Sequence, residues 1–172
     1  MNRPLHQFFE KDHRQIDMFL NRAIERPNEI EMDYYLQFRA RLLRHIKMEE
    51  KSLFPAAKKA GPEVVRELLP RYRLDHGAIT ALMVPPPTLS LIKVIRYILE
   101  EHNRAEEEPG GLYDICEALT LGQTQELLDE LMATKEVPVH PPNPAPIAME
   151  AAKRALARAG YDFDEIVRLT RR

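Results

Sequence analysis

Apolar side chains recur every three or four positions along several stretches of the sequence, and prolines separate these stretches. This period places apolar side chains on one face of an α-helix. Pro27, the pair Gly61-Pro62 and the run 85–87 mark the breaks. No stretch alternates apolar and polar residues as a half-buried strand does. The sequence therefore predicts four long helices, over about residues 5–24, 31–58, 63–83 and 89–108.

The pattern changes beyond residue 108. A fifth helix is predicted over about residues 124–134, and the proline-rich segment 136–146 is expected to form an extended, semi-rigid arm. A further helix is predicted over 147–159, with a last turn or two beyond it. We expect an all-α protein with two units. They are a helical bundle at 1–135 and an appendage at 136–172. The appendage is expected to pack on the bundle of its own chain or on that of a second subunit.

Composition narrows the function classes. The chain has 172 residues, a net charge of −2 and no block of like charge, so nucleic acid is not an expected partner. Its single cysteine, Cys116, cannot form an intramolecular disulfide. No uncharged run is long enough to span a bilayer, and no apolar signal segment stands at the N-terminus. These features predict a cytoplasmic protein without a membrane partner.

Polar residues interrupt the apolar faces of all four long predicted helices. His13 fills a gap in the first face. The second and fourth helices each carry a histidine followed four residues later by a glutamate, and the third carries a histidine. Four residues are about 6 Å of rise, so both side chains of a pair share one face. The inward-facing polar residues are His13, His45, Glu49, His76, His102 and Glu106.

Together these six residues predict a metal site. A lone inward histidine is usually a hydrogen-bonded core residue, and the His45–Glu49 pair alone could equally be a solvated surface pair. His6 and His140 fit no apolar face and keep that ordinary interpretation. Burying two unpartnered carboxylates, however, costs several kcal/mol each or forces them to take up protons. A pair of cations held by all six residues removes that cost.

The ligand types indicate the metal. Four imidazoles and two carboxylates without a thiolate argue against structural zinc, and the nitrogen ligands argue against calcium or magnesium. Iron is favoured, with manganese or a mixed iron–manganese pair as the alternative. Because ligation needs neutral imidazoles, the affinity for metal is expected to fall below about pH 6.

The six residues lie in a pattern: His13, then His45-Ile-Lys-Met-Glu49-Glu50-Lys-Ser-Leu-Phe-Pro55, Asp75-His76 and His102-Asn-Arg-Ala-Glu106-Glu107. This pattern resembles the hemerythrin-like, or HHE cation-binding, family over about residues 5–118. The resemblance implies an up-down four-helix bundle that holds two irons, bridged by Glu49, Glu106 and an oxo or hydroxo group. Family members bind dioxygen or nitric oxide, or sense iron and oxygen. Ferritin-like di-iron oxidases need two Glu-x-x-His motifs, and only Glu10–His13 has that spacing.

Two departures from the family pattern matter. Oxygen-carrying hemerythrins have a further histidine one turn before His76, where this sequence has Tyr72. Two octahedral irons would then keep about one open position each. Tyr72 is expected to pack in the core or to donate a hydrogen bond beside the site. In addition, Pro109 and two glycines break the fourth helix just past Glu106, so that end of the site is expected to be more open or more mobile.

Three functions stay open at this point. The first is a protein that binds or senses dioxygen, nitric oxide or iron. The second is a di-iron enzyme that reduces peroxide or oxygen, or a donor of iron for the repair of damaged iron centres. The third is a scaffold with a vestigial site, in which the C-terminal arm forms a homodimer. The sequence does not decide whether the protein is an enzyme.

Overall fold

The computed structural model describes residues 3–170, so the outermost residues of the two expected units, 1–2 and 171–172, lie outside the described residues. The described chain consists of helices and connecting segments and contains no strand. The predicted all-α class is therefore confirmed. The division into units at residue 135 stays a prediction.

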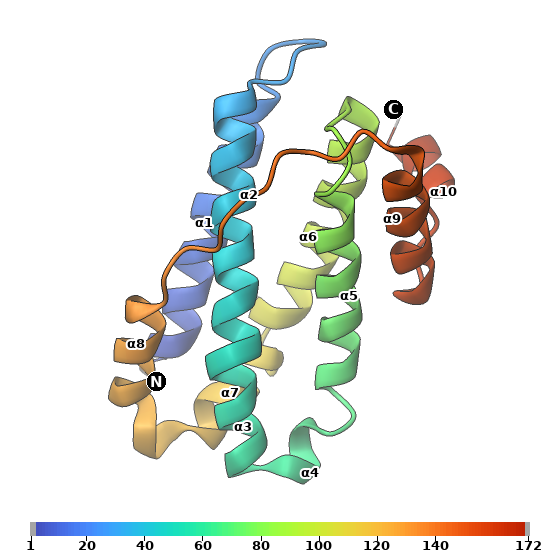
Figure 1. The fold of residues 1–172 in the computed structure, drawn as a ribbon. Coiled ribbons are helices and arrows are strands. Elements are labelled where there is room, and N and C mark those ends of the chain that lie inside the picture. Colours follow the sequence, from blue (N-terminus) through green and yellow to red (C-terminus); the bar gives the residue numbers. More distant parts are fainter. Residues whose placement is uncertain (1–2, 171–172) are drawn as a thin grey trace.

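Four long helices form the body of the molecule: α1 (Pro4–Ala23), α2 (Met32–Met48), α5 (Leu69–Leu82) and α6 (Leu89–Glu107). Helix α1 packs on α2, and α5 packs on α6. Figure 1 shows the chain reversing its direction from each of these helices to the next. Thr88 begins α6 by accepting a hydrogen bond from the Leu91 N–H, as helix-capping residues do. Helices α1 and α6 start and end within one residue of the predicted positions, whereas α2 ends and α5 begins inside the predicted ranges 31–58 and 63–83.

The second predicted helix contains a feature that periodicity does not reveal. A π-helical turn, Glu49–Leu53, follows α2, and α3 (Phe54–Ala60) continues it. Pro55 explains the wider turn, because in a regular helix its ring would clash with the Lys51 carbonyl and its missing N–H would leave that carbonyl unpaired. Turns of this kind often occur at functional sites, and this one begins at a candidate ligand.

The third predicted helix, residues 63–83, is divided near Pro70. A short helix, α4 (Pro62–Val65), precedes α5. Pro70 lies in the first turn of α5, where no backbone N–H is required. Helix α5 therefore starts one residue before the proline, and its inward-facing residues follow the regular helical period from there.

A helix that the sequence did not predict follows the break after α6. Gly110 adopts a φ of 80°, and α7 (Leu112–Leu119) begins directly after Gly111. A Cβ atom on Gly111 would lie 2.6 Å from the Ala105 carbonyl oxygen and 2.8 Å from that of Glu108. The chain can turn this sharply only because both positions are glycine. A 3₁₀ turn (Leu121–Gln123) then leads to the predicted fifth helix, α8 (Thr124–Ala133).

The C-terminal segment packs on the helices of its own chain. An extended stretch crosses from α2, where Arg44 donates to the Thr134 carbonyl (2.8 Å), to the end of α5, where the Asn143 N–H donates to Val84 (2.8 Å) (Figure 1). Helix α9 (Pro146–Arg158) then packs on α5, and α10 (Phe163–Leu169) packs on α6. The segment predicted as an extended arm has no helix or strand over residues 134–144, whereas its assignment to a separate appendage stays a prediction. A homodimer formed through this segment stays a prediction.

The apolar core is divided into two clusters. One contains Ile16, Leu42, Ile79 and Leu99, and it also receives Leu156 of α9. The other contains Phe9, Leu53, Tyr72 and Tyr113. Along each long helix, the candidate ligands lie at the positions between the two clusters. The fold thus places a polar layer inside an otherwise apolar core.

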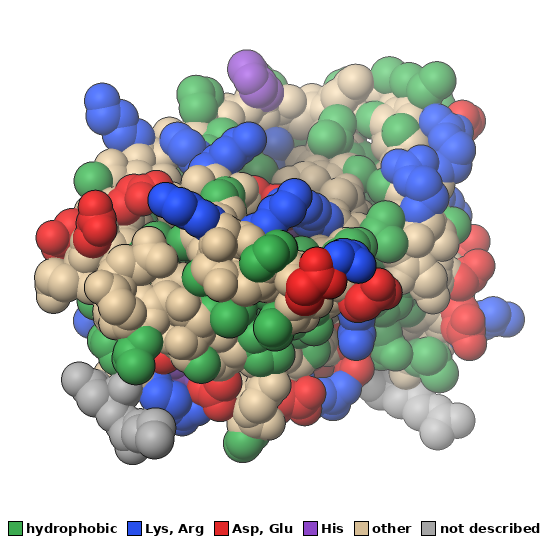
Figure 2. Space-filling view, turned by 90° about the horizontal axis from the view of Figure 1, so that it is seen from below, with side chains coloured by type: hydrophobic (Ala, Val, Ile, Leu, Met, Phe, Trp, Pro, Cys, Tyr) green, Lys and Arg blue, Asp and Glu red, His purple; other side chains and the backbone are tan. Residues whose placement is uncertain are grey.

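The surface adds little to this picture. Among the described residues, no helix is both long and apolar enough to cross a membrane. On the face drawn in Figure 2, basic and acidic side chains are interspersed with apolar ones, and histidine is almost absent. The chemistry suggested by the sequence is accordingly inside the molecule.

Replacing Gly111 by alanine should destabilise the protein by about 1–3 kcal/mol, because the new methyl group would overlap backbone carbonyls that cannot move aside. Gly122→Ala is the matched control, since a Cβ there meets no atom within 4 Å. Denaturant unfolding of both variants measures the difference. Equal stabilities would show that the turn tolerates a side chain.

Candidate metal centre

The structure brings all six predicted residues together in the polar layer. They come from α1, α2, the π-helical turn, α5 and α6, and each residue is buried, with at most 4% of its surface exposed. Periodicity predicts which face of each helix is inward, but not whether the inward polar residues of different helices lie at the same level along the bundle axis. Here they lie at the same level, and the four imidazoles and two carboxylates form one cluster.

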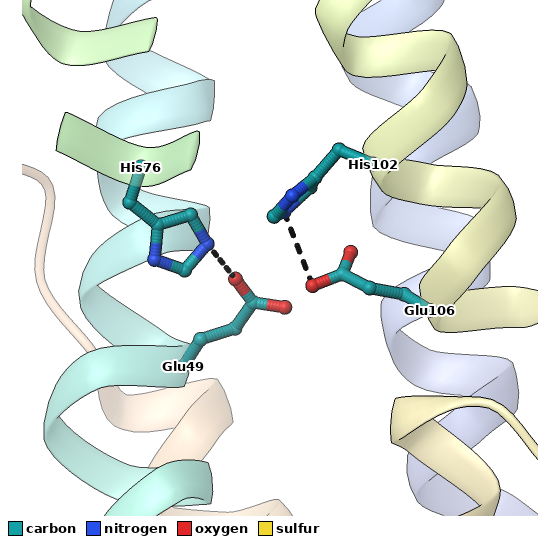
Figure 3. A group of neighbouring side chains, drawn as sticks. All are labelled: Glu49, His76, His102 and Glu106. Carbon is teal, nitrogen blue, oxygen red and sulfur yellow. Dashed lines mark ion pairs between the residues drawn. The ribbon is translucent and has the colours of Figure 1, made fainter. Parts of the chain in front are cut away.

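One half of the cluster consists of His76, His102, Glu49 and Glu106. Figure 3 shows their side chains pointing toward a common centre from α5, α6 and the π-helical turn. His76 Nε2 lies 3.0 Å from Glu49 Oε2, and His102 Nε2 lies 3.1 Å from Glu106 Oε1. One ligand atom from each of the four residues lies within 4.8 Å of the others, so the group could hold a metal ion.

The other half consists of His13 and His45 with the same two glutamates. The two Nε2 atoms are 3.0 Å apart. His13 Nε2 lies 3.4 Å from Glu106 Oε2, and His45 Nε2 lies 3.4 Å from Glu49 Oε1. His13, His45 and Glu106 also satisfy the distances of a metal-binding group.

The two glutamates are shared between the halves. Glu49 directs Oε1 toward His45 and Oε2 toward His76. Glu106 directs Oε2 toward His13 and Oε1 toward His102. Each carboxylate thus presents one oxygen to each pair of imidazoles, which is the arrangement that a carboxylate bridge between two ions requires.

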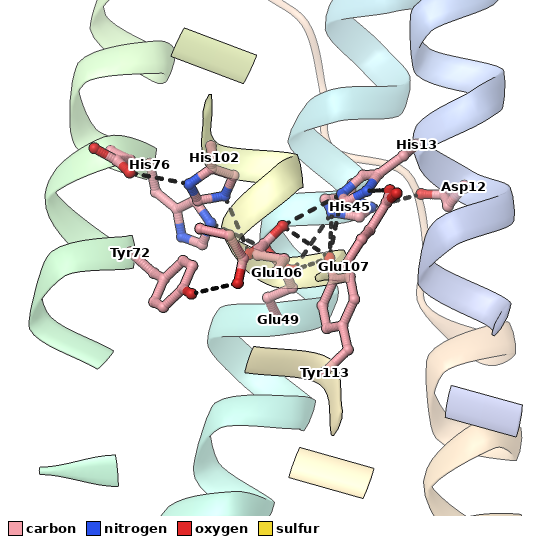
Figure 4. A network of polar contacts seen from close by, with 12 residues as sticks. Asp12, His13, His45, Glu49, Tyr72, His76, His102, Glu106, Glu107 and Tyr113 are labelled. Atoms are coloured by element: carbon pink, nitrogen blue, oxygen red, sulfur yellow. Dashed lines mark hydrogen bonds and ion pairs between the residues drawn. The ribbon is translucent and has the colours of Figure 1, made fainter. Parts of the chain in front are cut away.

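Each of the four imidazoles uses its other ring nitrogen to contact a carboxylate (Figure 4). The Nδ1 contacts are His13 with Glu107 (2.6 Å), His45 with Asp12 (2.9 Å), His76 with Glu50 (2.8 Å) and His102 with Asp75 (3.1 Å). A carboxylate at Nδ1 fixes the tautomer in which Nε2 is the ligand, and it orients the ring. All four Nε2 atoms are held ready for a cation.

The sequence pattern alone predicted no role for these four outer carboxylates, although a signal was present. Each directly adjoins an inward residue, in the pairs Asp12-His13, Glu49-Glu50, Asp75-His76 and Glu106-Glu107. Each nevertheless serves a histidine on a different helix: Asp12 on α1 contacts His45 on α2, and Asp75 on α5 contacts His102 on α6. The position of each acid next to an inward residue identifies it in the sequence, but the histidine that it contacts is known only from the fold.

Arginines support three of the outer carboxylates. Arg41 Nε donates to Asp12 (2.6 Å), Arg14 donates to Glu107 (2.7 Å) and Arg73 donates to Glu50 (2.9 Å). Burial alone would raise the pKa values of these acids, but hydrogen bonds from histidine and arginine lower them. Asp12, Glu50 and Glu107 therefore stay ionised and keep their hydrogen bonds to the imidazoles.

The electrostatics of the inner group fit a cation. Burial disfavours charged imidazoles, yet the neighbouring carboxylates raise the pKa values of His45 and His102 to about 10. Burial also opposes ionisation of Glu49, but His45 and His76 hold its pKa well below 4.5. Glu49 Oε2, His76 Nε2 and Glu106 Oε1 are buried without a properly aligned hydrogen-bond partner. Three such atoms facing one another are rare in protein cores, and a metal ion would satisfy all three.

Two tyrosines border the centre. The Tyr72 hydroxyl donates to the Ala105 carbonyl (3.0 Å), and its ring stands edge-on to His102, in agreement with the expected packing. Tyr113 was missed from the sequence. Its hydroxyl lies 2.7 Å from Glu49 Oε1 and 3.0 Å from Glu106 Oε2. The expectation of a more open end is therefore wrong, because the break after Glu106 turns the chain so that Tyr113 closes it.

The remaining histidines lie outside the cluster. His6 is buried, and its Nδ1 contacts Asp114 (2.8 Å). His140 is exposed in the extended segment. Among the described residues, neither is part of a group that could hold a metal; His6 is a hydrogen-bonded core residue, whereas His140 is a surface residue.

Comparisons with known proteins do not identify a family for this chain. No family model matches the chain, and no curated protein or solved structure matches it. The residues themselves define a helical protein with a buried histidine–glutamate cluster that could hold a metal ion.

Asp12→Asn should weaken metal binding about 10–100-fold, because an amide holds the His45 ring less firmly than a carboxylate does. Asp129→Asn is the matched control, since Asp129 is exposed and bonds only Gln125 on its own helix. Titration of both variants with Mn²⁺ provides the measurement. Equal affinities would remove the proposed role of the outer carboxylates.

Metal affinity should rise steeply between about pH 6 and about pH 8. With pKa values of about 10, His45 and His102 are protonated across this range until a metal displaces their protons. Each displaced proton makes the affinity roughly tenfold higher per pH unit, whereas Glu49 is already ionised and contributes no slope. Mn²⁺ titrations at several pH values test this dependence. An affinity that stays constant with pH would contradict it.

Proposed function

We propose that this protein is an up-down four-helix bundle of the hemerythrin-like type that holds two iron ions. The observation that carries the proposal is the sharing of Glu49 and Glu106, each with one oxygen toward each pair of imidazoles. The mixture of imidazole nitrogens and carboxylate oxygens, without thiolate, suits iron and, as the alternative, manganese. The alternating directions of α1, α2, α5 and α6 support the bundle topology.

The residues divide the work of such a centre. His13 and His45 would hold one ion, His76 and His102 the other, and both glutamates would bridge them, with an oxo or hydroxo group as the third bridge. When bound, the two irons would supply reversible binding of dioxygen or nitric oxide and electrons for their reduction. The outer carboxylates keep the imidazoles oriented, and the two apolar clusters exclude bulk water.

The burial of the centre favours the binding or sensing of a very small ligand. Glu49 and Glu106 are fully buried, and no histidine of the cluster is more than 4% exposed. A surface hollow next to the outer carboxylate Glu107 is lined largely by charged residues, among them Arg14 and Asp17. A diatomic molecule, azide or peroxide fits such a site better than an organic substrate does. Dioxygen and nitric oxide are therefore the proposed ligands.

Metal analysis and an optical spectrum of the oxidised protein test this function. We expect two irons per chain, the absorption of an oxo-bridged pair, and spectral changes on addition of azide or nitric oxide. Stoichiometric binding without turnover supports binding or sensing. Repeated turnover of peroxide would instead identify a redox enzyme, and protein that retains no iron after iron-supplemented expression would be a scaffold with a vestigial site.

Glu49→Ala should lose both irons, because this carboxylate faces both pairs of imidazoles. Glu126→Ala, an exposed change on α8, should retain both. Metal analysis after identical purification provides the comparison. If Glu49→Ala kept two irons per chain, the bridging role would be wrong.

A further inference from the structure

The phenol of Tyr113 lies within the candidate centre and not beside it. The break at Gly110 and Gly111 turns α7 back toward the bundle, which places Tyr113 in the layer of the candidate ligands (Figure 4). The side chain is 1% exposed. Its ring is stacked on Phe9, with 4.9 Å between centroids and an angle of 17°. This packing fixes the position of the hydroxyl oxygen.

That oxygen contacts every donor atom of one half of the cluster. It lies 2.7 Å from Glu49 Oε1 and 3.0 Å from Glu106 Oε2. It also lies 3.2 Å from His13 Nε2 and 3.4 Å from His45 Nε2. A hydroxyl that only closed a cavity would need one partner. This hydroxyl is centred over four atoms, each a candidate ligand of the same ion.

The separations among these five atoms match those of neighbouring ligands on one ion. With metal–ligand bonds of about 2.1 Å, adjacent ligands of a six-coordinate ion lie about 3.0 Å apart. The four contacts of the Tyr113 oxygen range from 2.7 to 3.4 Å. Around the other four atoms, His13 to His45 is 3.0 Å, and the contacts His13 to Glu106 and His45 to Glu49 are both 3.4 Å. The Tyr113 oxygen thus lies at the distance of a neighbouring ligand from each of these four atoms.

In the described part of the chain, the other half of the cluster has no such oxygen. The Tyr72 ring is T-shaped to the His102 ring at 5.5 Å between centroids, but its hydroxyl donates to the Ala105 carbonyl. Within residues 3–170, the two shared glutamates are therefore the further protein ligands beside His76 and His102. The two halves differ by one donor.

We propose that Tyr113 is a ligand of the metal held by His13 and His45. This inference rests on the proposed di-iron function and assigns a further residue to it. The phenol O–H is replaced by an O–iron bond, and the proton leaves to solvent with those displaced from the imidazoles. Five protein donors and the bridging oxygen fill that ion. The ion held by His76 and His102 keeps one open position, and azide, nitric oxide or dioxygen binds there.

The test compares Tyr113→Phe with the matched control Tyr72→Phe in iron-loaded, oxidised protein. Phenylalanine keeps the stacking on Phe9 and removes only the oxygen. We expect the wild type and Tyr72→Phe to show a phenolate-to-iron charge-transfer band in the visible range, and Tyr113→Phe to lack it at an unchanged two irons per chain. A band that persists in Tyr113→Phe, or that disappears in Tyr72→Phe, overturns the assignment.

Two further measurements keep the proposal falsifiable if Tyr113→Phe folds poorly. Resonance Raman spectra of the wild type should contain phenolate ring vibrations, and their absence overturns the proposal. Azide titration should saturate at one azide per pair of irons in the wild type, whereas saturation at two overturns it. Protein that binds no iron would sink the proposed function itself. Two irons without a tyrosine signature would sink only the role of Tyr113.

Discussion

The fold depends on the burial of two shared carboxylates within a layer of imidazoles. Without compensation, Glu49 and Glu106 would be among the costliest groups to place in a helical core, and they are completely buried. Each long helix therefore contributes a nitrogen or an oxygen to the same layer, and the apolar residues are divided into a cluster on either side. The layer also requires acids at the Nδ1 atoms of the histidines and arginines behind three of those acids. Outward from the glutamates, hydrogen-bond donors and acceptors thus follow one another to the surface.

Sequence periodicity predicted the parts of this arrangement that are local. A histidine in an apolar face, such as His13, is inward whatever the neighbouring helices do. A pair such as His102 and Glu106 shares a face because of helix geometry alone. Prolines and glycines marked the ends of the long helices, since they act on the backbone within a few residues. The helical class, the inward faces and the extended C-terminal arm follow from such local rules.

Features that depend on contacts between distant segments were not predictable in this way. The acid next to His13 holds His45, and the acid next to His76 holds His102, so sequence neighbours are not spatial partners. The π-helical turn follows from Pro55 but does not alter the apolar period enough to be detected. Tyr113 follows a helix break that suggested an opening. Its role depends on where α7 turns back toward the bundle, and the period of apolar residues does not predict that position.

The two tyrosines show why this last difference matters for chemistry. Counting ligands along the sequence drew attention to Tyr72, because oxygen-carrying hemerythrins have a histidine at that position, and it left about one open position on each iron. Tyr72 is instead engaged with a backbone carbonyl, whereas Tyr113 faces the opposite pair of imidazoles. A fifth protein donor beside His13 and His45 leaves the open position beside His76 and His102, the side on which the carriers place their additional histidine. The centre would then keep a single binding position, as a carrier does, but on the other metal. A hard phenolate oxygen in place of an imidazole would also favour the oxidised, ferric state of its ion, which suits sensing or redox work better than reversible transport.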